Sequence, residues 1–459
     1  MNGRNLDTFE NAPVARAVIT NVIPAIISMI MVLVYNLADT FFIGQTKDPY
    51  MVAAVSVATP VFLIFMAIGM LFGVGGTSLI SRMLGEGRGE EARHVSAFCF
   101  WTGAAVGLFG FAFIWLFMDP ICRLIGSSPD TIAYVKDYLG IVAIGIPALV
   151  VSNSFSNILR AEGKANLAMM GMIIGNLANI ILDPIMILWM GWGVAGAAAA
   201  TTIGNILALL FYIFYYLRGK SILSIHPKDY TIKGKIVGGV FAIGIPASLN
   251  SILMSTSNII VNNLMHQHGD MAVAGLGVAF KVNMVAVMLL IGMGTGIQPL
   301  LGYCYGAGNK ARFGKILRFS LTLAIGLSLV MTVLCYLGAG PMVSAFLEAQ
   351  DAHAYGMQFA RILIYSGPVI GILFVMTNAI QAMGAAIPSL ILSISRQGLV
   401  FIPVLFLFNA LFGTPESLVT AQPVADYIAV TLSVILFLVT YRRRFRSADA
   451  QPEPLPQEG

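Results

Sequence analysis

Long apolar stretches separated by short polar connections make up most of this chain. Each stretch has about 20 or more residues, the length that an α-helix needs to cross the hydrocarbon core of a bilayer. The pattern therefore predicts an all-α polytopic membrane protein with twelve transmembrane helices. We expect these helices at residues 16–42, 52–80, 95–117, 132–159, 166–189, 194–217, 237–265, 272–300, 316–338, 355–381, 388–411 and 421–441.

The composition agrees with the hydropathy pattern. Of the 459 residues, 58% are hydrophobic and only 10% are charged, whereas soluble domains carry about 25% charged residues. The four cysteines (Cys99, Cys122, Cys304 and Cys335) are widely spaced and form no CxxC motif, so we expect buried free thiols. The first 15 residues are polar and contain Asp7 and Glu10, which does not fit a cleavable signal peptide.

Short motifs of the first half return in the second half, 221 or 222 residues later. The matching pairs are Pro24 and Pro246, Leu84–Gly87 and Tyr305–Gly308, Gly145–Pro147 and Ser366–Pro368, Asn157 and Asn378, and Gly163 and Gly384. Each half holds six spans, an even number, so both halves cross the membrane in the same sense. We therefore expect two six-helix bundles related by a pseudo-twofold axis along the membrane normal.

This repeat predicts the domain organisation. An N-terminal six-helix lobe covers residues 1–217, and a basic cytoplasmic linker covers 218–235. A C-terminal six-helix lobe covers 236–445, and a Pro- and Glu-rich disordered cytoplasmic tail covers 446–459.

Most of the 26 Lys and Arg residues fall in alternate connections, on one predicted side of the membrane. Because cytoplasmic loops are enriched in Lys and Arg, we expect a multi-pass plasma-membrane protein with both termini in the cytoplasm. A net charge of +5 raises the question of a nucleic-acid partner. The basic residues are spread over several short loops rather than one patch, so we expect no nucleic acid.

An aspartate lies inside the fifth predicted span. Asp183 follows Asn179 by four residues, so the carboxylate and the amide share one face of a helix. Pro184 lacks an N–H group and displaces the carbonyl of Ile180, which opens the helix beside the acid. An acid at the centre of a membrane helix costs about 2.5–3.5 kcal/mol and usually serves function. These residues indicate a cation or proton site.

A second acid, Asp39, ends the first predicted span, on the same helix face as Tyr35 and next to Asn36. Apart from Asp426, which we expect near the outer face, only these two acids lie well inside the spans. At the repeat offset, Asp183 corresponds to Val404, and Asp39 falls near Ile260. Symmetric scaffolding alone would not place both acids in one half, so the first lobe is the expected coupling site.

Three segments resemble the multidrug and toxic-compound extrusion (MATE) family: Tyr35–Gly44, Asn179–Pro184 and Gly296–Tyr303. The resemblance covers about residues 10–445. It implies two six-helix bundles around a central cavity, and export of cationic or amphipathic compounds driven by sodium or proton entry. By resemblance, the first-lobe cation site consists of Asp39, Asn179, Asp183 and Thr201, with Tyr35, Asn153 and Asn157 as hydrogen-bonding neighbours.

The chemistry of such a site follows from its residue types. Two carboxylates that share a low-dielectric site cannot both stay charged cheaply, so one takes a proton or both share a hard cation. Asn179 and Thr201 would supply the neutral oxygens that Na⁺ prefers. The alternative is that both acids fix the packing of helices through satisfied partners. We expect no cofactor besides the coupling ion, H⁺ or Na⁺.

Four further residues are candidates for the substrate cavity: Asn36, Gln298, Lys281 and Arg396. Three of them have a competing interpretation. Gln298 precedes Pro299 and is explained by a helix kink. Lys281 and Arg396 are explained by pairing with carbonyls or by reaching lipid headgroups.

Other function classes fit less well. A membrane enzyme would need a metal-binding or clustered acidic motif, and ATP-driven export would need a Walker A sequence; neither motif occurs. A lipid-linked precursor flippase of related fold would need a cationic cavity, and only Lys281, Arg361 and Arg396 are available inside the spans. A passive channel would not need the repeat. We therefore expect a non-enzymatic secondary active antiporter that works by alternating access, as a monomer.

Overall fold

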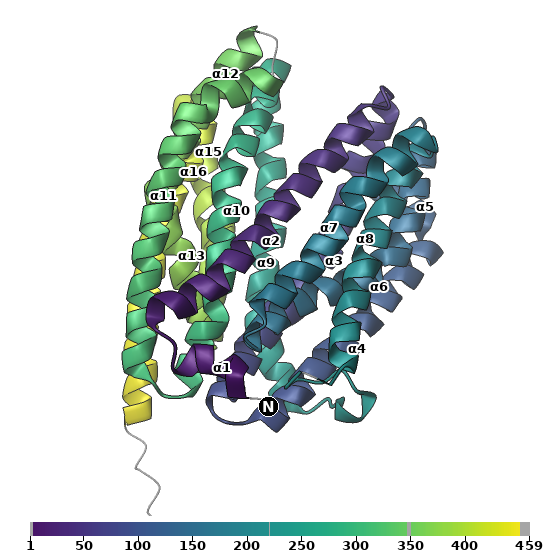
Figure 1. Cartoon of the computed structure of the whole chain (residues 1–459). Helices are drawn as coiled ribbons and strands as arrows, with labels where there is room; N and C mark the ends of the chain where they lie inside the picture. The colour runs from purple at the N-terminus through teal and green to yellow at the C-terminus, as the bar shows by residue number, and fades with distance from the viewer. Residues whose placement is uncertain (1–2, 220, 347–349, 450–459) are drawn as a thin grey trace, which may run out of the picture.

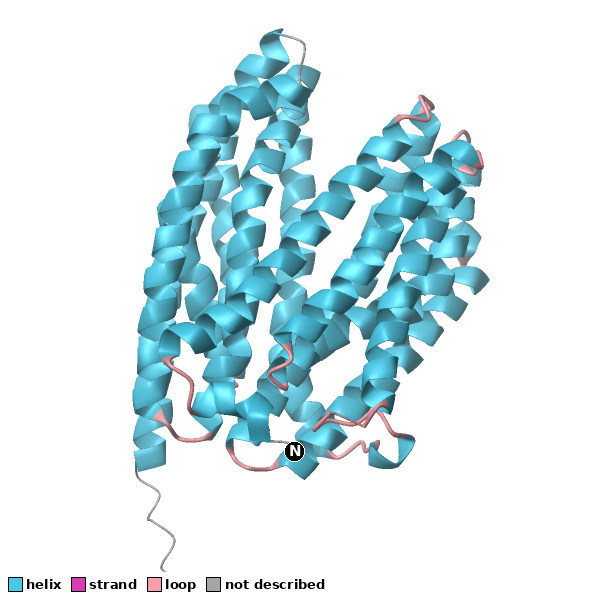
Figure 2. Ribbon diagram, in the orientation of Figure 1, coloured by secondary structure: helices cyan, strands magenta, loops and turns pink. Residues whose placement is uncertain are grey.

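The computed structural model describes residues 3–219, 221–346 and 350–449, and these residues form a bundle of long helices without strands (Figures 1 and 2). In the N-terminal lobe the helices are α1 Gly3–Glu10, α2 Val14–Gly44, α3 Pro49–Gly85, α4 Gly89–Leu116, α5 Met118–Leu124, α6 Ile132–Ala161, α7 Ala165–Asp183, η1 Pro184–Trp189 and α8 Gly193–Leu217. In the linker and C-terminal lobe they are η2 Pro227–Asp229, α9 Gly234–Met265, η3 His266–His268, α10 Asp270–Gly306, α11 Lys310–Phe346, α12 Gln350–Ile364, α13 Gly367–Ala382, α14 Ala386–Ile394, η4 Ser395–Phe401, α15 Ile402–Phe412 and α16 Pro415–Asp449.

The prediction of an all-α polytopic fold is confirmed. Among the described residues, eleven helices are long and apolar enough to span a membrane, and a bent pair raises the number to twelve. That pair, α12 and α13, was expected as one span at 355–381. Its two helices meet at 52° because Pro368, at the start of α13, cannot continue the hydrogen-bonding pattern of α12.

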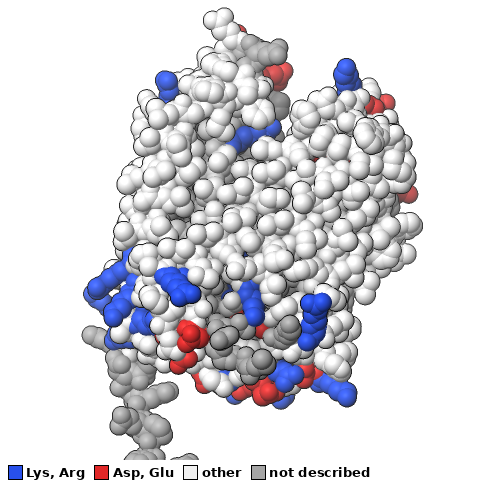
Figure 3. Space-filling model, viewed as in Figure 1, with Lys and Arg blue, Asp and Glu red and all other residues white. Residues whose placement is uncertain are grey.

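The two lobes meet at one end of the molecule and separate at the other. Figure 1 shows α2 leaning away from α10 toward the end opposite the N-terminus, and Figure 3 shows a notch between the lobes there. We call the end with the N-terminus the closed end, and the other the open end. The last described residues of α16 also lie at the closed end (Figure 1).

Glycines allow the helices of opposite lobes to touch near the closed end. A Cβ at Gly296 of α10 would lie 2.8 Å from the Cα of Val22 in α2. A Cβ at Gly75 of α3 would collide with the carbonyl oxygen of Val240 in α9. Gly75 and Gly296 are related by the repeat offset, so the two crossings are pseudo-symmetric counterparts.

A third crossing, between α3 and α10, is symmetric about its own centre. A Cβ at Gly85 would collide with the carbonyl oxygen of Tyr303, and a Cβ at Gly306 would collide with the carbonyl oxygen of Arg82. Nearby, the Ser78 hydroxyl donates to the Gln381 carbonyl across the two lobes. The helices of the two lobes therefore pack backbone against backbone at the closed end.

The N-terminal helix α1 also bridges the lobes at the closed end. Arg312 of α11 donates from Nε to the Phe9 carbonyl (2.6 Å) and from Nη2 to the carbonyls of Ala12 (2.7 Å) and Thr8 (3.4 Å). The Phe9 ring is fully buried and packs edge-on against Tyr303 of α10. We call this set of contacts the N-terminal clamp.

The linker lies on the N-terminal lobe. Glu162, at the end of α6, is fully buried and accepts hydrogen bonds from the Ile222 amide (2.8 Å), the Ser221 hydroxyl (2.8 Å) and the Tyr215 hydroxyl (3.3 Å). Burial raises the pKa of the Glu162 carboxyl above its ordinary value, and the three donors oppose that shift. The linker is thus attached to one lobe by a defined polar anchor.

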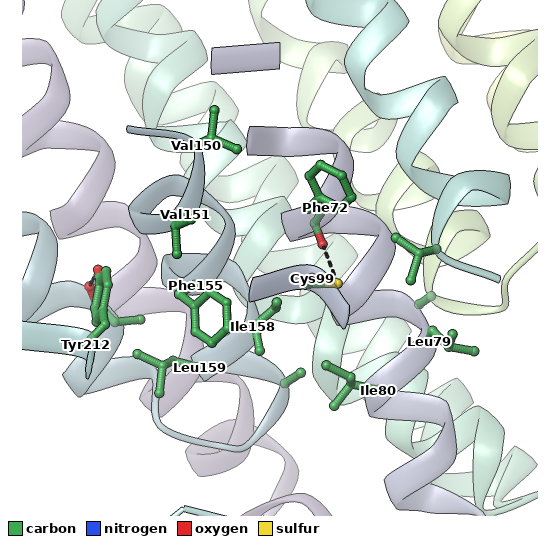
Figure 4. Packing of buried hydrophobic residues seen from close by; sticks show 14 of the residues in the cluster. Phe72, Leu79, Ile80, Cys99, Val150, Val151, Phe155, Ile158, Leu159 and Tyr212 are labelled. Carbon is green, nitrogen blue, oxygen red and sulfur yellow. Dashed lines mark hydrogen bonds between the residues drawn. The ribbon is translucent and has the colours of Figure 1, made fainter. Parts of the chain in front are cut away.

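The interior of the N-terminal lobe is packed with apolar side chains (Figure 4). Phe72 of α3, Phe155 and Ile158 of α6 and Tyr212 of α8 are buried together there. Cys99 lies among them, and its thiol contacts the Phe72 carbonyl oxygen at 3.6 Å (Figure 4). All four cysteines are buried and free, as expected from their spacing.

The predicted disordered tail at 446–459 begins too early. Helix α16 continues to Asp449, so residues 446–449 are helical, and the rest of that tail lies outside the described residues. The helix carries the basic run Arg442–Arg444 past the apolar part of the span. In Figure 3, Lys and Arg side chains gather around the closed end of the molecule, where this helix finishes.

We predict that bulk at the α3–α10 crossing opens the closed end. Gly306→Ala should increase the distance between spin labels attached at positions 88 and 315, because the new Cβ collides with the Arg82 carbonyl oxygen. Electron paramagnetic resonance of the purified protein measures this distance. Gly314→Ala, where a Cβ would meet no neighbour, is the control. Equal distances in both variants would contradict the prediction.

Candidate functional site

A hydrogen-bonded polar cluster lies inside the N-terminal lobe, between α7 and α8. Asp183 is fully buried, and Asn179 and Thr201 are 3% and 9% exposed. With its amide nitrogen toward the acid, Asn179 donates to Asp183 Oδ2 (3.2 Å) and accepts from the Thr201 hydroxyl and amide at 3.1 Å each. This orientation satisfies both ends of the amide, so we assign it. The three predicted residues are therefore brought together.

The helix changes its winding beside the acid. α7 ends at Asp183, and the following η1, which begins at Pro184, is a π-helix. Proline cannot donate to the carbonyl one turn earlier, and the wider turn of the π-helix accommodates this loss. Wide turns of this kind often occur at functional sites.

Asp39 approaches the cluster from α2. It is half-buried, and its carboxylate and that of Asp183 are close enough to repel each other. Both also interact electrostatically with the Tyr35 hydroxyl. One oxygen of each acid, Oδ1, is buried and has no hydrogen-bond partner among the described residues. A buried carboxylate oxygen without a donor is a costly arrangement, which a bound proton or cation would relieve.

Tyr138 of α6 lies near this site and was not predicted. It is 7% exposed and interacts electrostatically with Asp39, Asp183 and Tyr35. It lies near the start of a predicted span, beside Asp137, where tyrosine is typical of the membrane interface. Tyr138 is far from both acids in the sequence, so no local sequence pattern could have identified it.

Asn153 and Asn157 of α6, expected as hydrogen-bonding neighbours of the acids, have other contacts. The Asn153 side chain faces Gly69 of α3. Asn157 donates to the Asn153 carbonyl (3.1 Å) and accepts from Arg160 (3.0 Å). No hydrogen bond joins either amide to Asp39 or Asp183 in the described part of the chain.

Two of the predicted cavity residues, Asn36 and Gln298, differ in their hydrogen bonding. Asn36 is half-buried and donates to the Val32 carbonyl of α2 (2.8 Å). Gln298 is 2% exposed, and its amide nitrogen has no partner among the described residues. It directly precedes Pro299 within α10, which continues unbroken to Gly306.

The two basic candidates differ in their surroundings. Lys281 of α10 is half-buried, with its ammonium 4.9 Å from the centre of the Phe346 ring. Arg396 of η4 forms an ion pair with Asp426 of α16, at 3.3 Å between Nε and Oδ1. Asp426 is only 1% exposed, because the pair lies between packed helices of the C-terminal lobe.

Comparison with known proteins decides the family. The MatE family model matches the chain twice, at residues 24–185 and 246–407. The chain belongs to the MatE family. The two matches are offset by 222 residues, so they also confirm the internal repeat. Membership places this chain among multi-pass membrane transporters rather than enzymes.

Curated relatives match nearly the whole chain. The protein is 31% identical over 443 residues to the multidrug export protein MepA of Staphylococcus aureus strain MSSA476, covering 96% of this chain and 98% of MepA. It is 31% identical over 434 residues to MepA of Staphylococcus haemolyticus strain JCSC1435, covering 94% and 95%. The similarity therefore includes both lobes and the linker between them.

Solved structures show the same fold. A multidrug resistance MATE family transporter in an outward-facing conformation superposes with a TM-score of 0.91 at 24% identity, covering 98% of this chain and all of that one. A mutant of the Vibrio cholerae MATE transporter VcmN superposes with a TM-score of 0.88 at 21% identity, covering 94% and 98%.

We predict that Asn179 stabilises the cluster. Asn179→Ala removes the donor to Asp183 and the acceptor of Thr201, and it leaves buried groups unsatisfied. The free energy of unfolding should fall by about 1–3 kcal/mol. Thermal unfolding of the purified protein in detergent measures this change. Asn36→Ala is the control, because that amide donates to a carbonyl of its own helix; an equal loss in both variants would contradict the prediction.

Proposed function

We propose that this protein is a secondary active multidrug antiporter. It exports cationic or amphipathic organic compounds in exchange for H⁺ or Na⁺ by alternating access. One observation carries the proposal: two acids of the first lobe lie near each other, each with a buried oxygen that lacks a donor among the described residues. The names of the MepA relatives, multidrug export proteins, support the substrate class.

The geometry suggests how ion binding would act on the lobe. Asp39 is on α2, and Asp183 is at the junction of α7 and η1, so an ion or proton shared by both acids draws these elements together. Loss of the ion restores the repulsion between the two carboxylates. Because α2 also crosses α10 near the closed end, a shift of α2 reaches the interface between the lobes. Ion loading would thereby bias the molecule toward one of its two openings.

We further propose that the closed end faces the cytoplasm of a bacterial cell. The excess of Lys and Arg around this end supports that orientation (Figure 3). Both termini would then be cytoplasmic, and the notch would open to the outside. The two lobes of one chain can enclose a pathway, so we propose that the monomer is the functional unit.

The flippase alternative finds less support. A pyrophosphate headgroup would need free basic side chains in the cavity. Arg396 is neutralised by Asp426, the Arg361 guanidinium lies 5.9 Å from the Tyr336 ring centre, and Lys281 lies over Phe346. Asp39 and Asp183 have no ion pair with a basic residue in the described part of the chain, which favours cationic substrates.

Loss of either acid should abolish coupled export. In cells that express Asp39→Asn or Asp183→Asn, we expect ethidium efflux to fall to the rate of cells without the protein. Fluorescence of the dye measures efflux, and membrane fractions confirm equal expression. Asp119→Asn, which changes an exposed acid paired with Lys136, should keep wild-type efflux. Wild-type efflux in both site variants would reject the ion-coupling role.

The coupling ion can be identified in vesicles. Purified protein in liposomes should accumulate dye when the correct gradient, of H⁺ or of Na⁺, is imposed alone. Asp183→Asn should remove the response to that gradient, because it removes a charge that the ion neutralises. A wild-type response to neither gradient, in liposomes that bind the dye normally, would contradict the antiport mechanism.

A further inference from the structure

The C-terminal lobe contains a buried charge pair that the proposed function does not use. Arg396 Nε lies 3.3 Å from Asp426 Oδ1, and the side chains are only 11% and 2% exposed. Gln422 donates to the same oxygen from Nε2 at 3.1 Å. The guanidinium of Arg396 also lies 5.4 Å from the centre of the Phe374 ring, where an aromatic face attracts a cation.

The repeat relates this pair to the polar cluster of the first lobe. At an offset of 221 residues, Gln422 corresponds to Thr201 and Asp426 corresponds to Asn205. In the first lobe, Thr201 contacts Asn179, and Asn205 donates to the Thr201 carbonyl at 3.0 Å. The polar face of α16 is therefore the counterpart of the polar face of α8.

The position of Arg396 is where the two lobes differ. Its counterpart at the same offset is Gly175, which packs closely against Gly204 of α8. A Cβ at Gly175 would lie only 2.8 Å from the Gly204 carbonyl oxygen, so no side chain fits there. The C-terminal lobe instead has the wider π-helical turns of η4 at this level, and these carry the arginine.

The two lobes also differ in how their acids are satisfied. Asp39 and Asp183 each have a buried oxygen without a hydrogen-bond partner in the described part of the chain. Among the described residues, Asp426 has no such unpaired buried oxygen. The cation beside Asp426 belongs to the chain itself. A guanidinium stays charged, and its covalent attachment keeps it at the site in every step of a transport cycle.

We infer that Arg396 is a tethered cation that permanently neutralises the polar face of α16, the C-terminal counterpart of the polar face of α8, leaving exchange of a small cation to the first lobe alone. The statement about exchange rests on the proposed function; the statement about Arg396 does not. Removing the guanidinium would leave Asp426 with the amide of Gln422, which is the combination of groups found at Asp183 and Asn179. The C-terminal lobe would then bind a proton or an alkali cation.

Carbodiimide labelling tests the state of Asp426. Dicyclohexylcarbodiimide modifies protonated carboxyl groups in apolar surroundings and spares ionised, paired ones. The full-length purified protein is treated in sodium-free detergent solution, and mass spectrometry measures the adduct on the peptide that contains residue 426. We expect no adduct at Asp426 in the wild type and a clear adduct in Arg396→Met, which keeps much of the side-chain volume and removes its charge.

Two matched variants complete the labelling experiment. Arg396→Lys keeps the positive charge and should stay unlabelled at Asp426, and Arg396→Met/Asp426→Asn should give no adduct on this peptide. Added Na⁺ should reduce the labelling of Arg396→Met if the unmasked site takes an alkali cation as well as a proton. An adduct at Asp426 in the wild type, or none in folded Arg396→Met, would overturn the inference.

Efflux by the double variant provides an independent measurement. Arg396→Met/Asp426→Asn removes both charges together, so it leaves no unpaired charge even if Arg396→Met alone fails to fold. We expect ethidium efflux within about twofold of the wild type, because a neutral pair and an ion pair of similar volume are nearly interchangeable. Loss of efflux in a correctly folded double variant would show that the pair takes part in transport directly, against the inference. Since the labelling result does not depend on efflux, this failure is distinguishable from failure of the proposed antiport.

Discussion

A carboxylate taken out of water must be compensated, and this requirement governs the first lobe. Asp183 is fully buried, and Asn179 satisfies only one of its oxygens. The charged group that acts on it is Asp39, which repels it. Keeping both carboxylates ionised without a bound cation is therefore costly. Binding or release of a proton or cation at these acids changes the forces on α2 and α7.

The repeat supplies two similar bundles, but the chain uses them differently. Both lobes place a polar face of the last helix against a partner helix that contains a π-helical segment, η1 in one lobe and η4 in the other. In the first lobe this region holds two acids that have no basic partner among the described residues, and in the second it holds Arg396 with Asp426. Glycine crossings at the closed end preserve the symmetry where the lobes must fit together. The packing of the helices is thus pseudo-symmetric between the lobes, whereas the arrangement of buried charges is not.

Features that depend on local pattern could be predicted from the sequence. The spans, the repeat and the grouping of Asp183 with Asn179 follow from hydropathy, offset and helical spacing. The place of Tyr138 and the Arg396–Asp426 pair were not predicted, because their partners lie on helices far away in sequence and no spacing rule connects them. The break that Pro368 causes in the tenth span could not be predicted, because Pro147 at the corresponding position leaves α6 continuous.

The N-terminal clamp has a consequence for the rate of cycling. Arg312 holds three carbonyls near the N-terminus while Phe9 stays buried against the opposite lobe. If the closed end opens, the Phe9 ring must leave its buried position, and the three carbonyls become exposed to water. The time that the clamp needs to detach is then a lower limit on the duration of each turnover, whatever the affinity of the acids for their ion.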